Sequence, residues 1–172
     1  LTAMSRQSSI AEAPPRVSAL PIDPDDELML RLQDGDRRAF DALVERHDLL
    51  VQDRLNHASL LDAARITGAT LRRYPHADAG AAAQLLTGST ALNALIATDG
   101  VFSMDGDLAP LPELARHARE HQAWLLVDDA HGLGVLGQTG GGCLQQLQLS
   151  TEDVPLLIGT FGKAFGTCGA FV

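Results

Sequence analysis

Short hydrophobic runs alternate with helical patterns over most of residues 51–172. Apolar runs bounded by polar or glycine residues are typical of strands, and they lie at Thr70–Tyr74, Leu92–Ala97, Trp124–Val127 and Leu156–Ile158. Hydrophobic residues at helical spacing predict helices over Leu60–Ile66, Ala79–Leu86 and Leu111–His121. Strands that alternate with helices pair in parallel, because each connection crosses back over the sheet. The predicted fold class is therefore α/β, with a mainly parallel sheet and flanking helices.

The first 50 residues have a different pattern. Residues 1–22 contain serines and prolines without hydrophobic periodicity, which predicts a disordered leader. Asp23 is suited to begin a helix and Gly35 to end it. A second helix is predicted to begin near Asp36, and its apolar face includes Phe40, Leu43, Val44, His47, Leu50 and Val51. We therefore divide the chain into a leader at 1–22, a helical hairpin at 23–50 and a partial α/β domain at 51–172.

The composition is that of an acidic globular protein, with a net charge of −9 at pH 7. Nucleic acids and anionic membranes bind basic surfaces, so neither is expected as a partner. No apolar run approaches the roughly 18 residues of a membrane span, and no secretory signal pattern opens the chain. Cys143 and Cys168 have neither a metal-site nor a disulfide-framework spacing, which suits a reducing compartment. We expect a cytoplasmic protein.

Chemically active side chains follow two of the predicted strands. They are Asp128, Asp129 and His131 after the strand that ends at Val127, and Thr160 and Lys163 after the strand that ends at Ile158. Because the carboxyl ends of parallel strands share one edge of the sheet, we expect these groups to meet there. Lys163 is the only lysine in the chain, so any amine chemistry at this edge depends on it.

Two familiar kinds of site fit these groups poorly. A P-loop needs glycine and hydroxyl residues around its lysine, but here Leu157 replaces the first glycine and Ala164 replaces the hydroxyl residue. A metal site at Asp128 and His131 lacks a second cluster of ligands, so no metal is predicted.

A pyridoxal phosphate site fits better. It needs a lysine that bonds to the cofactor and a carboxylate that keeps the pyridine nitrogen protonated. Lys163 and Asp128 supply these two groups. Glycines at 159, 162, 166 and 169 flank the lysine, and glycine allows the backbone to approach a ligand closely.

Four segments, in order along the chain, resemble the α-oxoamine synthases, a family of pyridoxal phosphate enzymes. They are residues 53–60 (DRLNHASL), 98–107 (TDGVFSMDGD), 127–137 (VDDAHGLGVLG) and 159–166 (GTFGKAFG). The resemblance implies that residues 51–172 are part of the large domain of a fold type I pyridoxal-phosphate-dependent transferase.

The resemblance also implies that six side chains hold the cofactor or act with it. They are Lys163, which bonds to the cofactor; Asp128, which pairs with the pyridine nitrogen; His57, which stacks on the ring; Ser103 and His131, which approach the ring hydroxyl; and Thr160, which helps to hold the phosphate. The implied catalytic residues are Lys163, Asp128 and His57. Asp105, Asp107 and Asp129 are candidates for supporting or turn positions.

The implied reaction is the condensation of an amino acid with an acyl-CoA, with loss of CO2. The motifs are most similar to the member that joins L-alanine to pimeloyl-CoA, or to a pimeloyl carrier thioester, in biotin synthesis. The members known as 2-amino-3-oxobutanoate CoA ligase and 5-aminolevulinate synthase share these motifs and remain alternatives. Full-length members are expected to be homodimers.

Residues 25–47 are similar to something else, the opening helices of extracytoplasmic-function sigma factors. The α-oxoamine synthase resemblance covers only the middle of that family's cofactor domain. We therefore expect a truncated or fused form, joined near His47–Asp53, that is not active alone. A polymerase-binding regulator and an inactive remnant are the alternatives, although residues 52–172 contain no basic DNA-reading module.

Overall fold

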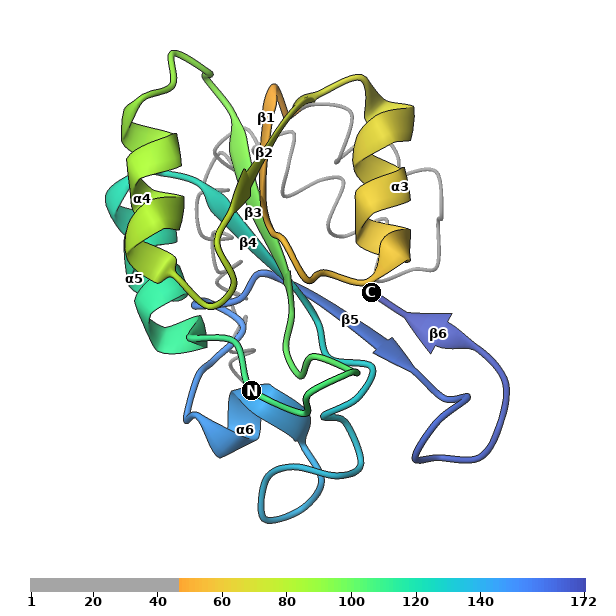
Figure 1. Ribbon diagram of the computed structural model, residues 1–172. Helices are drawn as coiled ribbons and strands as arrows, with labels where there is room; N and C mark the ends of the chain where they lie inside the picture. The colour runs from red at the N-terminus through yellow and green to blue at the C-terminus, as the bar shows by residue number, and fades with distance from the viewer. Residues whose placement is uncertain (1–46) are drawn as a thin grey trace, which may run out of the picture.

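Residues 47–172, which the computed structural model describes, form a sheet with helices on both faces (Figure 1). The strands are β1 (Leu49–Asp53), β2 (Thr70–Tyr74), β3 (Ala94–Asp99), β4 (Trp124–Asp128), β5 (Leu156–Thr160) and β6 (Ala170–Phe171). The helices are α3 (Ala58–Thr67), α4 (Ala79–Thr87), α5 (Leu111–Glu120) and α6 (Gly142–Gln146). The strand order is β2-β1-β3-β4-β5-β6, with all neighbours parallel except β5 and β6. The predicted fold class is confirmed.

The segment Leu49–Asp53 is a strand, so the helix predicted from Asp36 to Val51 is wrong at its end. Every residue of β1 is buried, and β1 lies between β2 and β3. A strand covered on both faces is a short continuous apolar run, which has no period that separates it from a helix. The boundary drawn at residue 50 therefore cuts through β1. The leader and the hairpin as far as residue 46 lie outside the described residues and stay predictions.

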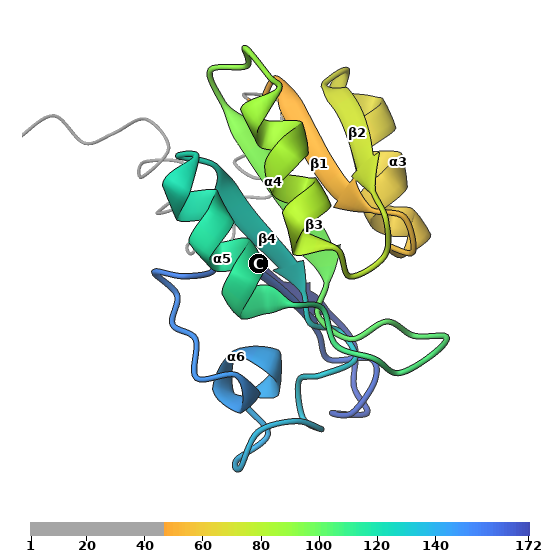
Figure 2. The same cartoon turned by 60° about the vertical axis from the view of Figure 1, so that its left-hand side comes forward.

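The order of the strands reverses between β1 and β3. From β1 the chain passes through α3 to β2, then through α4 back across β1 to β3, and through α5 to β4. Because crossovers between parallel strands are right-handed, opposite directions of travel place helices on opposite faces. Accordingly, α3 covers one face, and α4 and α5 cover the other (Figures 1 and 2). Such a reversal opens a crevice at the carboxyl ends of the strands, where ligands bind.

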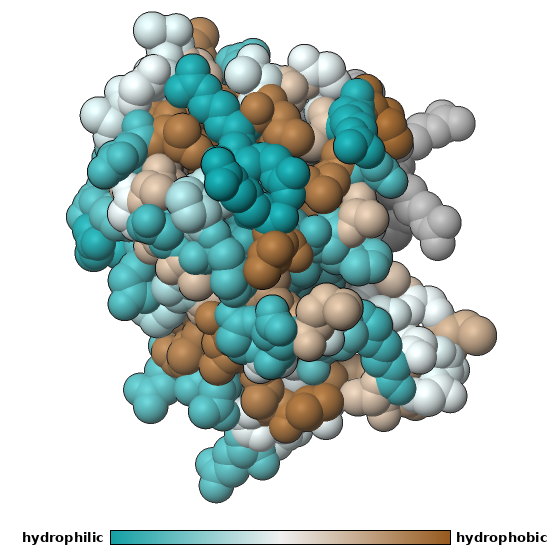
Figure 3. Space-filling view, in the orientation of Figure 1, coloured by the Kyte–Doolittle hydropathy of each residue, from teal (hydrophilic) through white to brown (hydrophobic). Residues whose placement is uncertain are grey.

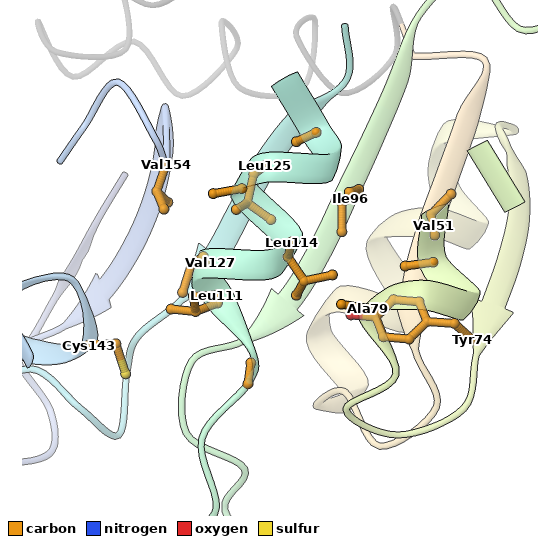
Figure 4. Packing of buried hydrophobic residues seen from close by; sticks show 14 of the residues in the cluster. Val51, Tyr74, Ala79, Ile96, Leu111, Leu114, Leu125, Val127, Cys143 and Val154 are labelled. Atoms are coloured by element: carbon orange, nitrogen blue, oxygen red, sulfur yellow. The ribbon is translucent and has the colours of Figure 1, made fainter. Parts of the chain in front are cut away.

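Successive strand residues face the two layers in turn. On the face of α4 and α5, the strand residues form one apolar cluster with residues of both helices, among them Ala79 of α4 and Leu111 and Leu114 of α5 (Figure 4). These strand residues are Leu49, Val51, Ile96, Leu125 and Val127. The residues between them, Leu50, Leu95 and Leu126, pack with Leu60 of α3 on the other face. Both faces of the sheet are therefore apolar, and its polar groups gather at the ends of the strands.

Local signals fix the ends of the predicted helices. Asp78 caps α4, because its Oδ1 accepts a hydrogen bond from the backbone N–H of Ala81 at 2.8 Å. Gly68 ends α3 in the left-handed conformation, with φ of 71°. Glu113 in the first turn of α5 and Arg119 in the last both complement the helix dipole. These helices are confirmed.

The glycine-rich passage after β4 folds around one carboxylate. Asp129 is fully buried, and its Oδ2 accepts a hydrogen bond from the backbone N–H of Cys143 at 2.7 Å. A Cβ at Gly142 would lie 2.0 Å from this oxygen, and one at Gly132 would lie 2.1 Å from Oδ1. Burial raises the pKa of Asp129. Asp129 therefore holds the glycine-rich turn together from its buried side. Helix α6, which we did not predict, begins at this turn.

Exposed hydrophobic residues are scattered over the surface. On the face seen in Figure 3, brown hydrophobic residues lie among hydrophilic ones. Ile66, Leu92 and Met104 are the most exposed of the large hydrophobic residues described, and they come from α3 and from the loops before and after β3. Single exposed apolar side chains are normal on a protein surface. Nor is any helix within residues 47–172 long and apolar enough to cross a membrane.

Truncation of Leu114 to Ala is expected to lower the free energy of unfolding by about 2–5 kcal/mol, because it leaves a cavity between α5 and the sheet. The matched variant Ile66→Ala, at a position 84% exposed, should change it by less than about 0.5 kcal/mol. Urea unfolding of the two variants measures both values. Equal effects would contradict the packing described here.

Candidate active site

A pocket of about 180 Å³ opens at the carboxyl ends of β1, β3, β4 and β5. All six side chains that the resemblance implied line it, namely His57, Ser103, Asp128, His131, Thr160 and Lys163. A larger hollow of about 490 Å³ lies beside the starts of β1 and β2 and includes Asp48 and Arg72. The described residues that line that hollow include no amine, no imidazole and no pair of carboxylates, so the smaller pocket is the candidate site.

The loop after β1 is tied to the end of β3, and this places His57. The side-chain Nδ2 of Asn56 donates to the carbonyl of Ala97 at 2.8 Å, and its Oδ1 accepts from the backbone N–H of Asp99 at 3.1 Å. Asp99 Oδ2 in turn accepts from the backbone N–H of His57 at 2.9 Å. His57 also caps α3 through Nδ1, which pairs with Ser59. The backbone of His57 is thus held by Asp99 and its ring by Ser59 at the pocket wall.

Two carboxylates lie side by side at the floor of the pocket. In the pairing of β3 with β4, Asp99 stands opposite Asp128. Burial raises the pKa of Asp99 to about 6, and the nearby charge of Asp128 adds to this effect. Asp128 Oδ1 accepts from the backbone N–H of Ala130 at 3.1 Å, which orients the carboxylate at the strand end. Asp99 is thus a buried carboxyl group beside Asp128, and its burial together with that neighbouring charge raises its pKa.

Lys163, in the loop after β5, contacts His131, in the loop after β4. Lys163 Nζ lies 2.8 Å from His131 Nε2. Burial lowers the pKa of His131, and the cationic Lys163 lowers it further. The imidazole is therefore neutral near pH 7 and accepts the hydrogen bond from the lysine. This contact joins the loop after β4 to the loop after β5.

Thr160 and Lys163 belong to a hairpin between β5 and β6. Thr160 Oγ1 donates to the carbonyl of Gly169 at 3.2 Å and accepts from the backbone N–H of Gly162 at 3.1 Å. The backbone N–H of Phe161 donates to Gly169, which closes the hairpin. β6 was not predicted, because a strand of two residues after Gly169 carries no detectable alternation. The hairpin sets the distance of the lysine from the strand end.

Sequence reasoning missed Asp99 as a site residue. It occupies the last position of its strand, as Asp128 does in the next one, and that position was an available signal. The roles of the six side chains stay predictions. Their grouping of one amine, one carboxylate, two imidazoles and two hydroxyls fits the groups of pyridoxal phosphate. Among residues 47–172, no three His, Cys, Asp or Glu side chains form a group suited to a metal ion.

The family model for aminotransferase class I and II matches residues 34–172. The chain belongs to this family. Its fold is the mainly parallel sheet with flanking helices of fold type I pyridoxal-phosphate-dependent enzymes. The match begins upstream of Val51, where the resemblance to α-oxoamine synthases was expected to begin.

Relatives within the family agree with the resemblance seen in the sequence. The 8-amino-7-oxononanoate synthase of Alkalilimnicola ehrlichii is 63% identical over 133 residues, which are 77% of this chain and 34% of that protein. The structure of 8-amino-7-oxononanoate synthase from Francisella tularensis has a TM-score of 0.63 and 33% identity, covering 83% of this chain and 39% of that one. Serine palmitoyltransferase from S. paucimobilis, with a pyridoxal phosphate–myriocin aldimine bound, has a TM-score of 0.68 and 32% identity, covering 72% and 31%.

The chain thus spans about a third of the length of the curated relatives. The resemblance to the α-oxoamine synthases is confirmed. The similarity of residues 25–47 to sigma factors lies, except for His47, outside the described residues. It stays a prediction.

Replacement of Asp99 by Asn is expected to change how stability depends on pH. Because the folded-state pKa of Asp99 is raised to about 6, its stabilising effect is full below the unfolded pKa and is lost as the pH rises through 6. Asn keeps an oxygen for the His57 N–H and has no charge. Relative to the wild type, the variant should therefore gain about 1–3 kcal/mol of unfolding free energy between pH 4 and pH 8. If urea unfolding shows the same change of unfolding free energy with pH in the variant and in the wild type, the raised pKa of Asp99 is contradicted.

Proposed function

We propose that the chain is the central part of a pyridoxal-phosphate-dependent acyltransferase of the 8-amino-7-oxononanoate synthase type. Such an enzyme condenses L-alanine with pimeloyl-CoA, or with a pimeloyl carrier thioester, and releases CO2 in biotin synthesis. The observation that carries the proposal is the position of the only lysine, 2.8 Å from His131 in a pocket that Asp128 also lines. Family membership and the names of the relatives support it.

Each wall of the pocket would hold one part of the cofactor. Asp128 would pair with the pyridine nitrogen, His57 would lie against the ring, and Thr160 would hold the phosphate. Ser103 and His131 would donate to or accept from the ring hydroxyl. When bound, the cofactor supplies an electron sink for the carbanion that forms next to the amino group of the substrate.

The side chains of the pocket would then manage protons and charge. Lys163, in its neutral form, would remove the α-proton of the amino acid, and the hydrogen bond between Nζ and His131 would hold the amine at the pocket wall. The neutral His131 ring favours this role because it adds no second positive charge beside the amine. The carboxylate of Asp128 would stabilise positive charge on the ring nitrogen, which strengthens the electron sink.

The partners follow from this proposal. They are L-alanine and the acyl thioester as substrates, and a second copy of the complete protein as the dimer partner. We propose a cytoplasmic location for the same reason, since thioester substrates of this kind are intracellular metabolites.

Incubation of the chain with pyridoxal phosphate, followed by borohydride, is expected to leave a pyridoxyl label on Lys163, because this is the only side-chain amine in the sequence. Peptide mapping by mass spectrometry locates the label. Lys163→Ala should lose it. A label confined to the amino terminus would contradict the proposed cofactor site.

The same labelling experiment measures how much Asp128 contributes to cofactor binding. Loss of a charge-assisted hydrogen bond of about 1.5–3 kcal/mol should raise the cofactor concentration for half-maximal labelling about 10- to 100-fold in Asp128→Asn. Asp62→Asn is the matched control, because its side chain on α3 is 61% exposed and pairs with Arg65 of the same helix, outside the pocket. Equal labelling of Asp128→Asn and the control would exclude Asp128 as the partner of the cofactor.

A further inference from the structure

His76 lies between two carboxylates that come from different parts of the chain. Its Nδ1 is 3.1 and 3.3 Å from the two oxygens of Asp53, at the end of β1. Its Nε2 is 2.8 Å from Oδ2 of Asp107, in the loop between β3 and α5. His76 itself is in the loop between β2 and α4. None of these three residues lines the pocket.

Asp53 anchors the segment that leads to His57. Its side chain is almost fully buried, and Oδ1 accepts a hydrogen bond from the backbone N–H of Leu55 at 2.8 Å. Oδ2 accepts from the backbone N–H of Ala77, also at 2.8 Å. The carboxylate therefore joins the start of the His57 loop to the loop of His76.

The loop that carries Ser103 touches His76 on both sides of the serine. Before it, Phe102 is buried and packs edge to face on the imidazole, with ring centroids 4.4 Å apart. After it, Asp107 accepts the hydrogen bond from Nε2. The loop is closed by backbone bonds from Phe102 N–H to the Asp107 carbonyl at 2.9 Å and from Gly106 N–H to the Phe102 carbonyl at 2.8 Å.

We propose that His76, as an imidazolium, is a positioning residue that fastens the loops of His57 and Ser103 to each other at the mouth of the pocket. This inference rests on the proposed function, in which both of those side chains hold the cofactor. His76 acts through Asp53 and Asp107 and does not itself touch the ligand.

The charge state follows from the contacts. A neutral imidazole has one N–H, so only the protonated ring donates to both carboxylates. Burial by itself lowers the pKa of His76, but the hydrogen bonds and charges of Asp53 and Asp107 outweigh it and raise the pKa. Tyr74 of β2 also interacts with Asp53, and burial raises the pKa of Tyr74, so it stays neutral. Oδ1 of Asp107 has no hydrogen-bond partner among the described residues, which leaves His76 to balance that carboxylate.

The link that His76 makes between the loops of His57 and Ser103 therefore depends on pH. Because the pKa of His76 is higher in the folded chain, its stabilising effect is full below the unfolded value and is lost as the pH rises through the folded value. Above that pH the ring releases one carboxylate, and the loop of Ser103 should open more often.

The test measures hydrogen-exchange protection of the Phe102 and Gly106 amides by NMR in the full chain without cofactor. In His76→Gln, which cannot donate to both carboxylates, protection should fall about tenfold or more. In the wild type it should fall in one step as the pH rises through the titration of His76, which the NMR signal of the ring reports directly. His117→Gln is the matched control, because His117 pairs with Glu120 of the same helix, α5, and with no described residue of either loop. In His117→Gln, the protection of the Phe102 and Gly106 amides should equal that in the wild type.

A second variant keeps the test decisive if His76→Gln does not fold. Asp107→Asn keeps an oxygen for Nε2 without the charge, at a side chain that is 40% exposed. In Asp107→Asn, the fall in amide protection should therefore occur at a lower pH than in the wild type. Protection that is unchanged in His76→Gln, or a step that does not move in Asp107→Asn, would overturn the proposal.

Cofactor binding separates this inference from the function on which it rests. With pyridoxal phosphate, His76→Gln should need about tenfold more cofactor than His117→Gln for half-maximal labelling of Lys163. Loosened loops with unchanged labelling would overturn the positioning role. Absence of label in the wild type would overturn the proposed function, while the exchange measurements would still decide whether His76 fastens the two loops.

Discussion

The parallel pairing of β3 with β4 and of β4 with β5 is the constraint on which the site depends. The register sets Asp99 opposite Asp128, and it brings the loops after β4 and β5 together so that His131 meets Lys163. The apolar faces of these strands hold the register, because a shift by one residue would turn every buried side chain to the wrong layer. Burial at the strand ends then shifts the titration of both groups, raising the pKa of Asp99 to about 6 and lowering the pKa of His131 so that its ring is neutral near pH 7.

The polar groups that support the pocket do not line it themselves. Asn56 ties the loop of His57 to β3, Asp129 holds the glycine-rich turn, and His76 joins two loops by charge. Each satisfies backbone or side-chain groups that would otherwise be buried without partners. The pocket walls are therefore positioned by side chains that never reach the ligand.

Much of the fold could be predicted from periodicity alone, because β2, β4 and the helices α3 to α5 have clear patterns and capping residues. β1 could not, since Leu49–Val51 continues the apolar spacing of the residues before it, and only burial on both faces marks it as a strand. For the site, the strand ends after Val127 and Ile158 indicated where Asp128 and Lys163 would meet. The contacts of Asp99 with His57 and of His76 with Asp107 join residues 42 and 31 positions apart, so only the strand order reveals them.

The central claim is that the sheet assembles these groups before any ligand binds. The most direct measurement is the pKa of the His131 ring by NMR in the cofactor-free chain, with the signal assigned by His131→Gln. Because Lys163 lowers this pKa together with burial, Lys163→Met, which removes the charge and the N–H donor to His131, should move it upward toward the ordinary value. A pKa of His131 that is the same in the wild type and in Lys163→Met would contradict the account, because it would place the lysine away from the end of β4.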